Sequence, residues 1–310
     1  ALPIYGGMKL LFLEPFAGES HLQVARGFAR HSRHQVDLVT MPDRFWKWRM
    51  RGAALHFASR VDPQPYHAII ASDMMGVADL KALWGSACPP LILYCHETQL
   101  SYPAPQESEA DLHFGFTNIT SCLAAEEVWF NSAFHRDSFL GGLPSFLKRM
   151  PDYRPAWVVD TIAKRSRVVY PGIDPPPDNG ERGEPLPGQS ATVCVRGGSS
   201  SAPVILWNHR WEFDKQPEGF FSAIDELADR GLDFSLLILG ESSQARPAVF
   251  EAARKRHAGR ILHLGFVRDR AEYQRKLAYA DQVVSCAIQE NFGISVLEAV
   301  ASGAQPVLPN

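Results

Sequence analysis

The sequence predicts an α/β protein with two domains, each built on a parallel, doubly wound sheet of Rossmann type. Three observations lead to this prediction. Short apolar runs alternate with helical patterns, each run ends in polar or turn residues, and the alternation restarts after a segment rich in proline and glycine. The chain has 310 residues, of which 45% are hydrophobic, and this suffices for two domains with separate cores.

In the first half, six apolar runs have the length and composition of buried strands. They lie at residues 8–16, 35–42, 67–73, 90–97, 126–132 and 166–173. A turn (AGESH) and a helical pattern (LQVARGFARH) separate the first two runs. Because ligands of such sheets bind beyond the carboxyl ends of the strands, we expect the polar clusters EPFAGESH, CHETQ and FNSAF to converge on one edge.

The composition places the first domain at 8–173, a linker or loop at 174–203 and the second domain at 204–310. The middle segment contains DPPPDNGERGEPLPGQ and RGGSSSAP, which hold too few apolar residues to build a core. The second domain ends on AQPVLPN, which we expect to be a strand. A covering helix should follow that strand, so we expect this domain to be incomplete at its C-terminus. A cleft between the two domains is the expected ligand site.

Charge and cysteine usage exclude several classes of protein. The net charge of −3 gives no global basic field. The five cysteines are scattered and form no CxxC pair, which speaks against a disulfide framework or a zinc site and predicts a cytoplasmic location. No apolar run approaches the roughly 20 residues of a membrane span, so we expect no membrane partner.

The segment QENFGISVLEAVASG places two carboxylates, Glu290 and Glu298, beside a flexible backbone. Either glutamate alone could be an ordinary solvent-facing residue. Between them, however, Asn291, Phe292, Gly293 and Ile294 lead from a strand into a helix, whose first backbone N–H groups form an anion site. Phosphate on the helix start and hydroxyls on the carboxylates would together suit a nucleotide sugar.

A second element has the complementary charge. The segment WNHRWEFDKQPEGF places Arg210 and Lys215 between a strand and a helix, where two cations could neutralise a diphosphate without a metal ion. By itself the segment could equally be a solvated loop, but together with the glutamate pair it favours a donor site. No DxD pair stands at a strand end, so we expect neither a metal nor another cofactor.

On these motifs, the second domain resembles the nucleotide-sugar-binding half of the retaining GT-B glycosyltransferases of family four. The segments ILHLGFV and YADQVVSCAIQENFGISVLEAVASGAQPVL carry the resemblance. It implies that Arg210 and Lys215 bind the donor diphosphate, that Glu290 contacts the transferred sugar and that Glu298 holds the ribose hydroxyls. The mechanism that it implies is same-face attack, with the leaving phosphate assisting deprotonation of the acceptor hydroxyl.

The first domain resembles a narrower group, the tRNA-queuosine mannosyltransferase family. The segments LEPFAGESHLQVARGF, MPDRFWKWRMRGAALHFA, YCHETQLSYP, FGFTNITSCLAAEEVWFNSAFHRDSFL and MPDYRP carry this resemblance. It implies transfer of mannose from GDP-mannose to queuosine in an aspartate tRNA. Two alternatives stay open: the same fold acting on a lipid or glycan, and a non-catalytic RNA-binding protein with a relic sugar-nucleotide pocket.

Several residues of the first domain are candidates for the site. Gly18 opens a turn where donor phosphate and acceptor could approach the backbone, and His21 could contact the acceptor or cap the helix. His96 ends a strand and is either structural or a catalytic residue that contacts the donor sugar or a developing charge. Glu97 and Asn131 are expected on the acceptor side.

The segment FWKWRMR interleaves aromatic side chains with the cations Lys47, Arg49 and Arg51. An exposed surface of this kind suits single-stranded RNA, through phosphate contacts and base stacking. An amphipathic helix with its tryptophans in the core explains the pattern equally well. A second group of cations that could meet tRNA phosphates comprises Lys148, Arg149 and Arg154.

Overall fold

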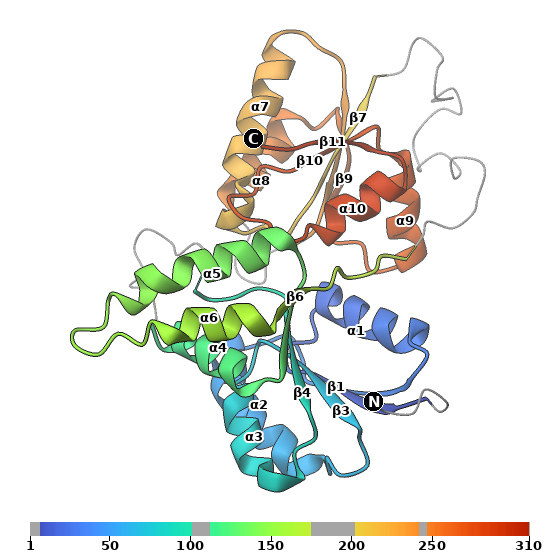
Figure 1. The fold of residues 1–310 in the computed structure, drawn as a ribbon. Coiled ribbons are helices and arrows are strands. Elements are labelled where there is room, and N and C mark those ends of the chain that lie inside the picture. The colour runs from blue at the N-terminus through green and yellow to red at the C-terminus, as the bar shows by residue number, and fades with distance from the viewer. Residues whose placement is uncertain (1–6, 101–111, 175–201, 242–246, 310) are drawn as a thin grey trace. The chain divides into compact units, whose positions relative to one another are not determined.

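The computed structural model describes residues 7–100, 112–174, 202–241 and 247–309, which form two compact units, 1–172 and 173–310. Each unit holds one parallel sheet with helices on both faces (Figure 1). Most of the predicted linker falls in residues 175–201, outside the described residues.

Unit 1 contains a six-stranded sheet in the order β2-β1-β3-β4-β5-β6, and all its neighbouring strands are parallel. Its strands are β1 (Lys9–Glu14), β2 (Gln35–Thr40), β3 (Ala68–Ser72), β4 (Leu91–Cys95), β5 (Glu127–Phe130) and β6 (Ser166–Val168). Its helices are α1 (Glu19–His31), α2 (Trp46–Arg60), α3 (Val77–Trp84), α4 (Leu112–Ala124), α5 (Ala133–Leu147) and α6 (Trp157–Arg165), with a 3-10 turn η1 (Gly85–Ala87). All six predicted strands are present.

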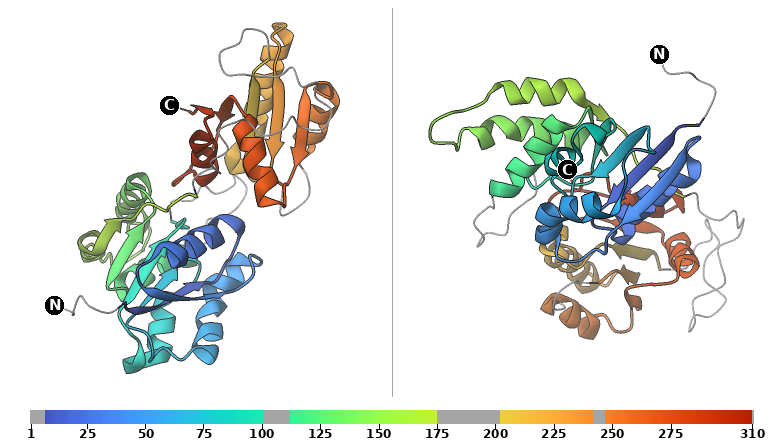
Figure 2. Two further views of the ribbon diagram at one scale, coloured as in Figure 1. Left: turned by 90° about the vertical axis from the view of Figure 1, so that its right-hand side faces the viewer. Right: turned by 90° about the horizontal axis from the view of Figure 1, so that it is seen from below.

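The alternation of side chains along β1 explains why both faces of this sheet are covered. Leu11 and Leu13 point into a core shared with α2 to α6, whereas Phe12 packs against Phe28 of α1, with ring centroids 5.9 Å apart. Figure 2 shows α1 lying across the opposite face of the sheet from those helices. A strand that is apolar on both faces reads as a continuous apolar run, which is how the sequence presents it.

Unit 2 contains a five-stranded parallel sheet in the order β11-β10-β7-β8-β9. Its strands are β7 (Val204–Asn208), β8 (Ser235–Leu239), β9 (Ile261–Gly265), β10 (Gln282–Val284) and β11 (Gln305–Val307). Its helices are α7 (Pro217–Asp229), α8 (Ala248–Arg256), α9 (Arg270–Tyr279) and α10 (Ile294–Ala301), with a 3-10 turn η2 (Phe213–Lys215). Helices α7 and α8 cover one face and α9 and α10 the other (Figure 1).

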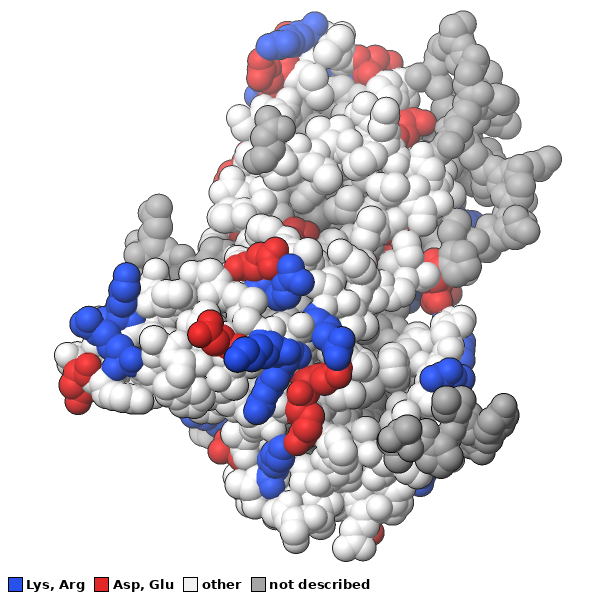
Figure 3. All heavy atoms as spheres, viewed as in Figure 1, with Lys and Arg blue, Asp and Glu red and all other residues white. Residues whose placement is uncertain are grey.

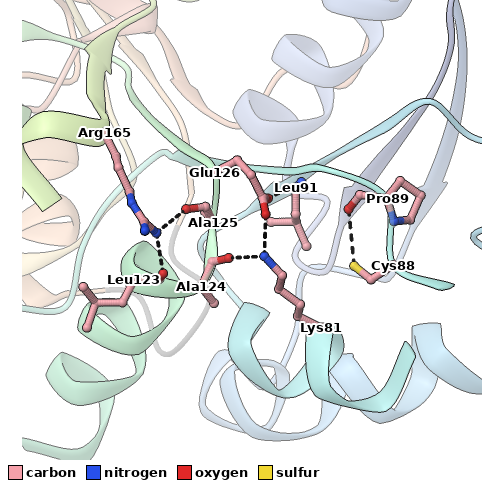
Figure 4. A network of polar contacts seen from close by, with 9 residues as sticks. All are labelled: Lys81, Cys88, Pro89, Leu91, Leu123, Ala124, Ala125, Glu126 and Arg165. Atoms are coloured by element: carbon pink, nitrogen blue, oxygen red, sulfur yellow. Dashed lines mark hydrogen bonds and ion pairs between the residues drawn. The ribbon is translucent and has the colours of Figure 1, made fainter. Parts of the chain in front are cut away.

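Arg165, the last residue of α6, stabilises the C-terminal end of α4. Arg165 Nη1 donates to the carbonyl oxygens of Leu123 and Ala125, at 2.5 and 2.8 Å. Lys81 Nζ donates to the Ala124 carbonyl at 2.7 Å and pairs with Glu126 (Figure 4). Cations at the carboxyl end of a helix satisfy its last carbonyls and complement its dipole. Arg165 is therefore engaged in holding the fold.

Candidate active site

The candidate site of unit 2 gathers around an ion pair between Lys215 and Glu290. Lys215 Nζ lies 2.9 Å from Glu290 Oε2 and 3.2 Å from Asp214 Oδ2. Burial by itself lowers the pKa of Lys215, but the two carboxylates raise it, and the pKa lies above its ordinary value. Lys215 is therefore a buried ammonium with its charge stabilised, and it lies in the turn η2 between β7 and α7, where the sequence predicts it.

Arg210 follows β7 and is exposed, with Nη1 3.6 Å from Glu212 Oε2. His209, which the sequence analysis did not single out, lies beside it. Burial lowers the pKa of His209 to about 4, so this imidazole is neutral at pH 7. The structure thus places one exposed and one buried cation after the same strand.

The second glutamate of the pair, Glu298, is buried in α10 and bonded within unit 2. Its Oε1 accepts a hydrogen bond from Arg270 Nη2, and its Oε2 accepts one from the Tyr273 hydroxyl at 3.2 Å. The Asn208 amide donates in turn to the Tyr273 hydroxyl, at 3.3 Å, and to the Ser295 carbonyl, at 2.8 Å. Glu298 is therefore held in place by the start of α9 and by the end of β7.

The start of α10 has the geometry that the sequence predicts. Gly293 adopts a left-handed conformation (φ 79°, ψ 47°), which favours glycine, and no side chain caps the helix. A Cβ at Gly293 would lie 3.3 Å from Glu290 Cγ, so the backbone passes close to this glutamate. Asn291 and Phe292 lead into the turn, and Ile294 begins the helix. The N–H groups of the first turn of a helix can bind an anion, and this turn follows directly after Glu290.

In unit 1, the predicted polar clusters do meet at one edge of the sheet. Glu14 ends β1 and is fully buried, with its Oε2 3.3 Å from His96 Nε2 and its Oε1 3.5 Å from His21 Nδ1. The imidazoles of His21 and His96 are stacked, with centroids 3.9 Å apart and planes inclined by 9°. The sequence analysis missed Glu14, although a glutamate inside the apolar run LLFLEP is a signal of a buried carboxylate.

The N-terminal turn of α1 contains two residues predicted for the site, His21 and Gly18. No side chain caps α1, so His21 is not a helix cap but packs against Glu14 and His96. Gly18 has φ −66° and ψ 164°, which any residue can adopt, and a Cβ there would meet only the Asp43 side chain, at 3.5 Å. The conformation of this turn therefore does not require a glycine.

Asn131 is buried and forms a hydrogen bond with the backbone of His96. Its side-chain amide donates to the His96 carbonyl at 2.9 Å, and its Oδ1 lies 2.8 Å from Nδ1 of His135. Glu97 is half-buried beside His96. Asn131 was predicted on the acceptor side, but its side-chain amide is hydrogen-bonded to other residues of unit 1.

The aromatic and cationic segment at the start of α2 divides between core and surface. Trp46 packs on Phe114, with centroids 5.0 Å apart, whereas Trp48 is 75% exposed and Phe45 is 69% exposed. The alternative that buries both tryptophans in the core is therefore wrong for Trp48. Of the three predicted cations, Lys47 and Arg51 are exposed, and Arg49 is half-buried and donates through two nitrogens to the Pro42 carbonyl, at 3.3 and 3.2 Å.

The second predicted group of cations lies between α5 and α6. Lys148, Arg149 and Arg154 are exposed there, and basic side chains gather at this end of the two helices (Figure 3). Tyr153 is 66% exposed in the same segment. Among the residues that the structure describes, no helix is long and apolar enough to cross a membrane.

Comparison with known proteins gives matches to both units. A family described as tRNA-queuosine alpha-mannosyltransferase N-terminal matches residues 9–173, and one described as glycosyl transferases group 1 matches residues 197–310. The chain is 34% identical over 310 residues to the tRNA-queuosine alpha-mannosyltransferase of Drosophila melanogaster, covering 97% of this chain and 79% of that protein.

Solved structures with a similar fold are glycosyltransferases of GT-B type. The catalytic domain of starch synthase IV from Arabidopsis thaliana, bound to ADP and acarbose, has a TM-score of 0.64 at 14% identity, covering 98% of this chain and 83% of that chain. Anabaena HepE in complex with UDP-glucose has a TM-score of 0.60 at 16% identity, covering 97% and 80%. The predicted GT-B fold is confirmed.

Proposed function

The chain belongs to the tRNA-queuosine alpha-mannosyltransferase family, and we propose that it is the enzyme that transfers mannose from GDP-mannose to queuosine in a tRNA of the aspartate type. The observation that carries the donor part is the cluster of Lys215, Glu290 and the start of α10. It offers a buried cation, a partly exposed carboxylate and the N-terminal turn of a helix within one unit.

The donor diphosphate would lie against Lys215, Arg210 and the N-terminal end of α10. Charge grows on this diphosphate as the glycosidic bond breaks, and fixed donors in a partly dry site stabilise such charge without rearranging. Lys215 is kept protonated by Glu290 and Asp214, so it is charged before the substrate arrives. These groups supply the positive charge that a divalent ion supplies in other transferases.

The sugar and the ribose would each meet one glutamate. Glu290 is 36% exposed in its side chain and stands next to the diphosphate site, where it can orient the mannosyl ring. Glu298 is fixed by Arg270 and Tyr273, so its carboxylate is already oriented for hydrogen bonds from ribose hydroxyls. Retention follows if the queuosine hydroxyl attacks from the face that the diphosphate leaves and gives its proton to the leaving phosphate.

The acceptor side would be formed by unit 1. His96, held between Glu14 and the Asn131 amide, is neutral at pH 7 because burial and the charge of His21 lower its pKa to about 4. A neutral imidazole can contact a sugar hydroxyl without adding charge. The exposed Phe45 and Trp48 next to Lys47 and Arg51 suit a single-stranded RNA loop, where bases stack and phosphates meet cations.

The direct test is incubation of the protein with labelled GDP-mannose and two tRNA preparations, with and without queuosine. Label transfer to the queuosine-containing tRNA alone is the expected result. A parallel reaction with UDP-glucose tests the choice of donor. A reaction with Glu290→Gln tests for a contaminating transferase, because this variant should keep its fold but lose transfer. Equal labelling of both tRNAs, or of neither, contradicts the proposal.

A further inference from the structure

The start of α9 carries a guanidinium that is held in place beside Glu298. Arg270 is the first residue of α9, and the side chain of Asp269 caps this helix by accepting the N–H of Glu272 at 2.7 Å. Tyr273 follows Arg270 on the same helix face. The guanidinium carbon of Arg270 lies 5.2 Å from the centroid of the Tyr273 ring, and Nη2 donates to Oε1 of Glu298. These two contacts orient the side chain of Arg270.

Most N–H groups of Arg270 are unused among the residues that the structure describes. A guanidinium has five N–H donors, and the bond to Glu298 is the one that this side chain forms with the described residues. The side chain of Arg270 is 40% exposed, whereas that of Glu298 is 6% exposed. Burial by itself lowers the pKa of Arg270, but the bond to Glu298 raises it above its ordinary value. Arg270 is therefore a charged fork that can bind further acceptors.

The same cluster contains a buried acceptor that lacks a hydrogen-bond donor among the described residues. The side-chain NH2 of Asn208 donates to the Tyr273 hydroxyl and to the Ser295 carbonyl, but Oδ1 of Asn208 is buried without a partner. Buried polar atoms are nearly always hydrogen-bonded, so an unpaired one in a polar cluster indicates a place for water or for a ligand hydroxyl. Around Glu298, donors and acceptors are thus left for a ligand.

The sheet topology places Arg270 away from the proposed diphosphate site. Lys215 and Glu290 follow β7 and β10, which are neighbours, whereas Arg270 follows β9, which β8 separates from β7. Neighbouring strands are about 4.8 Å apart, so the ends of β7 and β9 are roughly 10 Å apart. In a nucleoside diphosphate, the base and the phosphates are attached to opposite ends of the ribose. A ribose on Glu298 with its diphosphate at Lys215 therefore has its base on the side of Arg270.

The nucleotide bases differ in what they present to a guanidinium. Guanine offers two adjacent acceptors, O6 and N7, and an arginine can bind both at once. Adenine offers N7 beside an amino donor at N6, and a pyrimidine such as thymine or uracil offers O4 alone. A planar fork of N–H donors at the base therefore discriminates in favour of guanine.

We propose that Arg270 determines the nucleotide specificity of the donor site, because its guanidinium donates to O6 and N7 of the guanine base. This deepens the proposed function and rests on it for the identity of the donor. Nη2 bonds to Glu298 and so holds the fork, while the remaining N–H groups donate to the base. Glu298 then has two tasks, since it binds the ribose and orients the residue that recognises the base.

Calorimetry with GDP, ADP and 7-deaza-GDP, which lacks the N7 acceptor, tests this in the whole protein. The parent should bind GDP about 10-fold or more tightly than either of the other two nucleotides. Arg270→Met should bind all three with similar affinity, because it has no N–H donors with which to distinguish them. Arg275→Met, which removes an exposed arginine of the same helix, is the matched control and should keep the parental preference.

Two results overturn the inference. One is a parent that binds 7-deaza-GDP as tightly as GDP, which needs no variant to measure. The other is an Arg270→Met variant that loses the same factor for all three nucleotides, since Arg270 would then act only through Glu298. A parent that prefers GDP but transfers no mannose contradicts the proposed function and leaves this inference intact. A parent that binds ADP or UDP more tightly than GDP overturns both.

Discussion

Lys215 and Glu290 are separated by 75 positions in the sequence, yet their Nζ and Oε2 atoms lie 2.9 Å apart. The pair joins the 3-10 turn after β7 to the loop before α10, and Asp214 supports the same ammonium. Lys215 is buried, and these two carboxylates stabilise its charge against the cost of burial. A diphosphate that reaches this ammonium would therefore meet a cation that is already oriented.

Replacing this cation should weaken donor binding. We expect Lys215→Met to lower GDP affinity by about 10-fold or more, since a hydrogen bond to a charged group contributes about 1.5–3 kcal/mol. Isothermal titration calorimetry with GDP measures this. Lys276→Met is the matched control, because Lys276 is also nearly buried in unit 2 but pairs with Glu272 within α9. Equal losses in both variants would show a general effect on folding.

The contributions of Glu298 and Arg270 to donor binding should be coupled. Glu298→Gln removes the charge that orients the ribose and that holds Arg270, and we expect GDP binding to weaken by about 1.5–3 kcal/mol. Arg270→Met should also weaken it, and the double variant should lose less than the sum, because the residues are in direct contact. Glu226→Gln, which breaks an exposed pair with Arg230, is the control. Strict additivity would contradict the coupling.

The pairs Lys215–Glu290 and Glu298–Arg270 differ in how much of each could be predicted from the sequence. The order of strands and helices was predictable because continuous apolar runs and amphipathic patterns follow directly from two-sided burial of a parallel sheet. Glu290 and Lys215 were predictable from their positions after strands. Arg270 and Tyr273 were not, because α9 carries no local motif and only the fold brings it to Glu298. Glu14 was missed for the same reason, because the two histidines that it contacts come from other segments.

His135 makes a testable contribution to acid sensitivity. Burial, with a smaller effect from His96, lowers its pKa from 6.5 to about 3, so the native state binds fewer protons than the unfolded state between these values. Stability should therefore fall as the pH drops from about 6.5 towards 3, by at most about 1.4 kcal/mol per pH unit for this group. Urea unfolding at several pH values should show a shallower dependence for His135→Gln.

The exposed His31 provides the control for this measurement, because His31→Gln removes a histidine at the end of α1 without touching a buried group. Its pH dependence should match that of the parent. A His135→Gln variant with the parental slope would show that folding does not lower the pKa of this imidazole.

Mannosyl transfer should continue in excess chelator. The positive charge at the proposed diphosphate site comes from Lys215, Arg210 and the start of α10, so no divalent ion is needed to balance the leaving group. Initial rates in EDTA, followed by addition of magnesium or manganese, measure this. The expected rate is unchanged throughout. Loss of activity that either metal restores would overturn this account of the donor site.

The surface at the start of α2 should determine RNA affinity in two separable ways. Lys47 and Arg51 are exposed cations, so we expect Lys47→Glu with Arg51→Glu to weaken tRNA binding and to flatten its dependence on salt. Trp48 is 75% exposed, and Trp48→Ala should cost about 1–3 kcal/mol with an unchanged salt slope, because stacking releases no counterions. Arg49 is left intact, since its bonds to the Pro42 carbonyl hold the start of the helix.

Filter binding of tRNA at several salt concentrations distinguishes these effects. The matched control is Arg254→Glu with Lys255→Glu, which reverses two exposed charges on α8 of unit 2 and should change tRNA affinity less. GDP affinity should stay at the parental value in the α2 variants, because α2 lies in unit 1 and Lys215, Glu290 and Glu298 lie in unit 2. If the α2 double variant binds tRNA like the parent at every salt concentration, its cations are structural. The exposed group of Lys148, Arg149 and Arg154 then becomes the surface to reverse next.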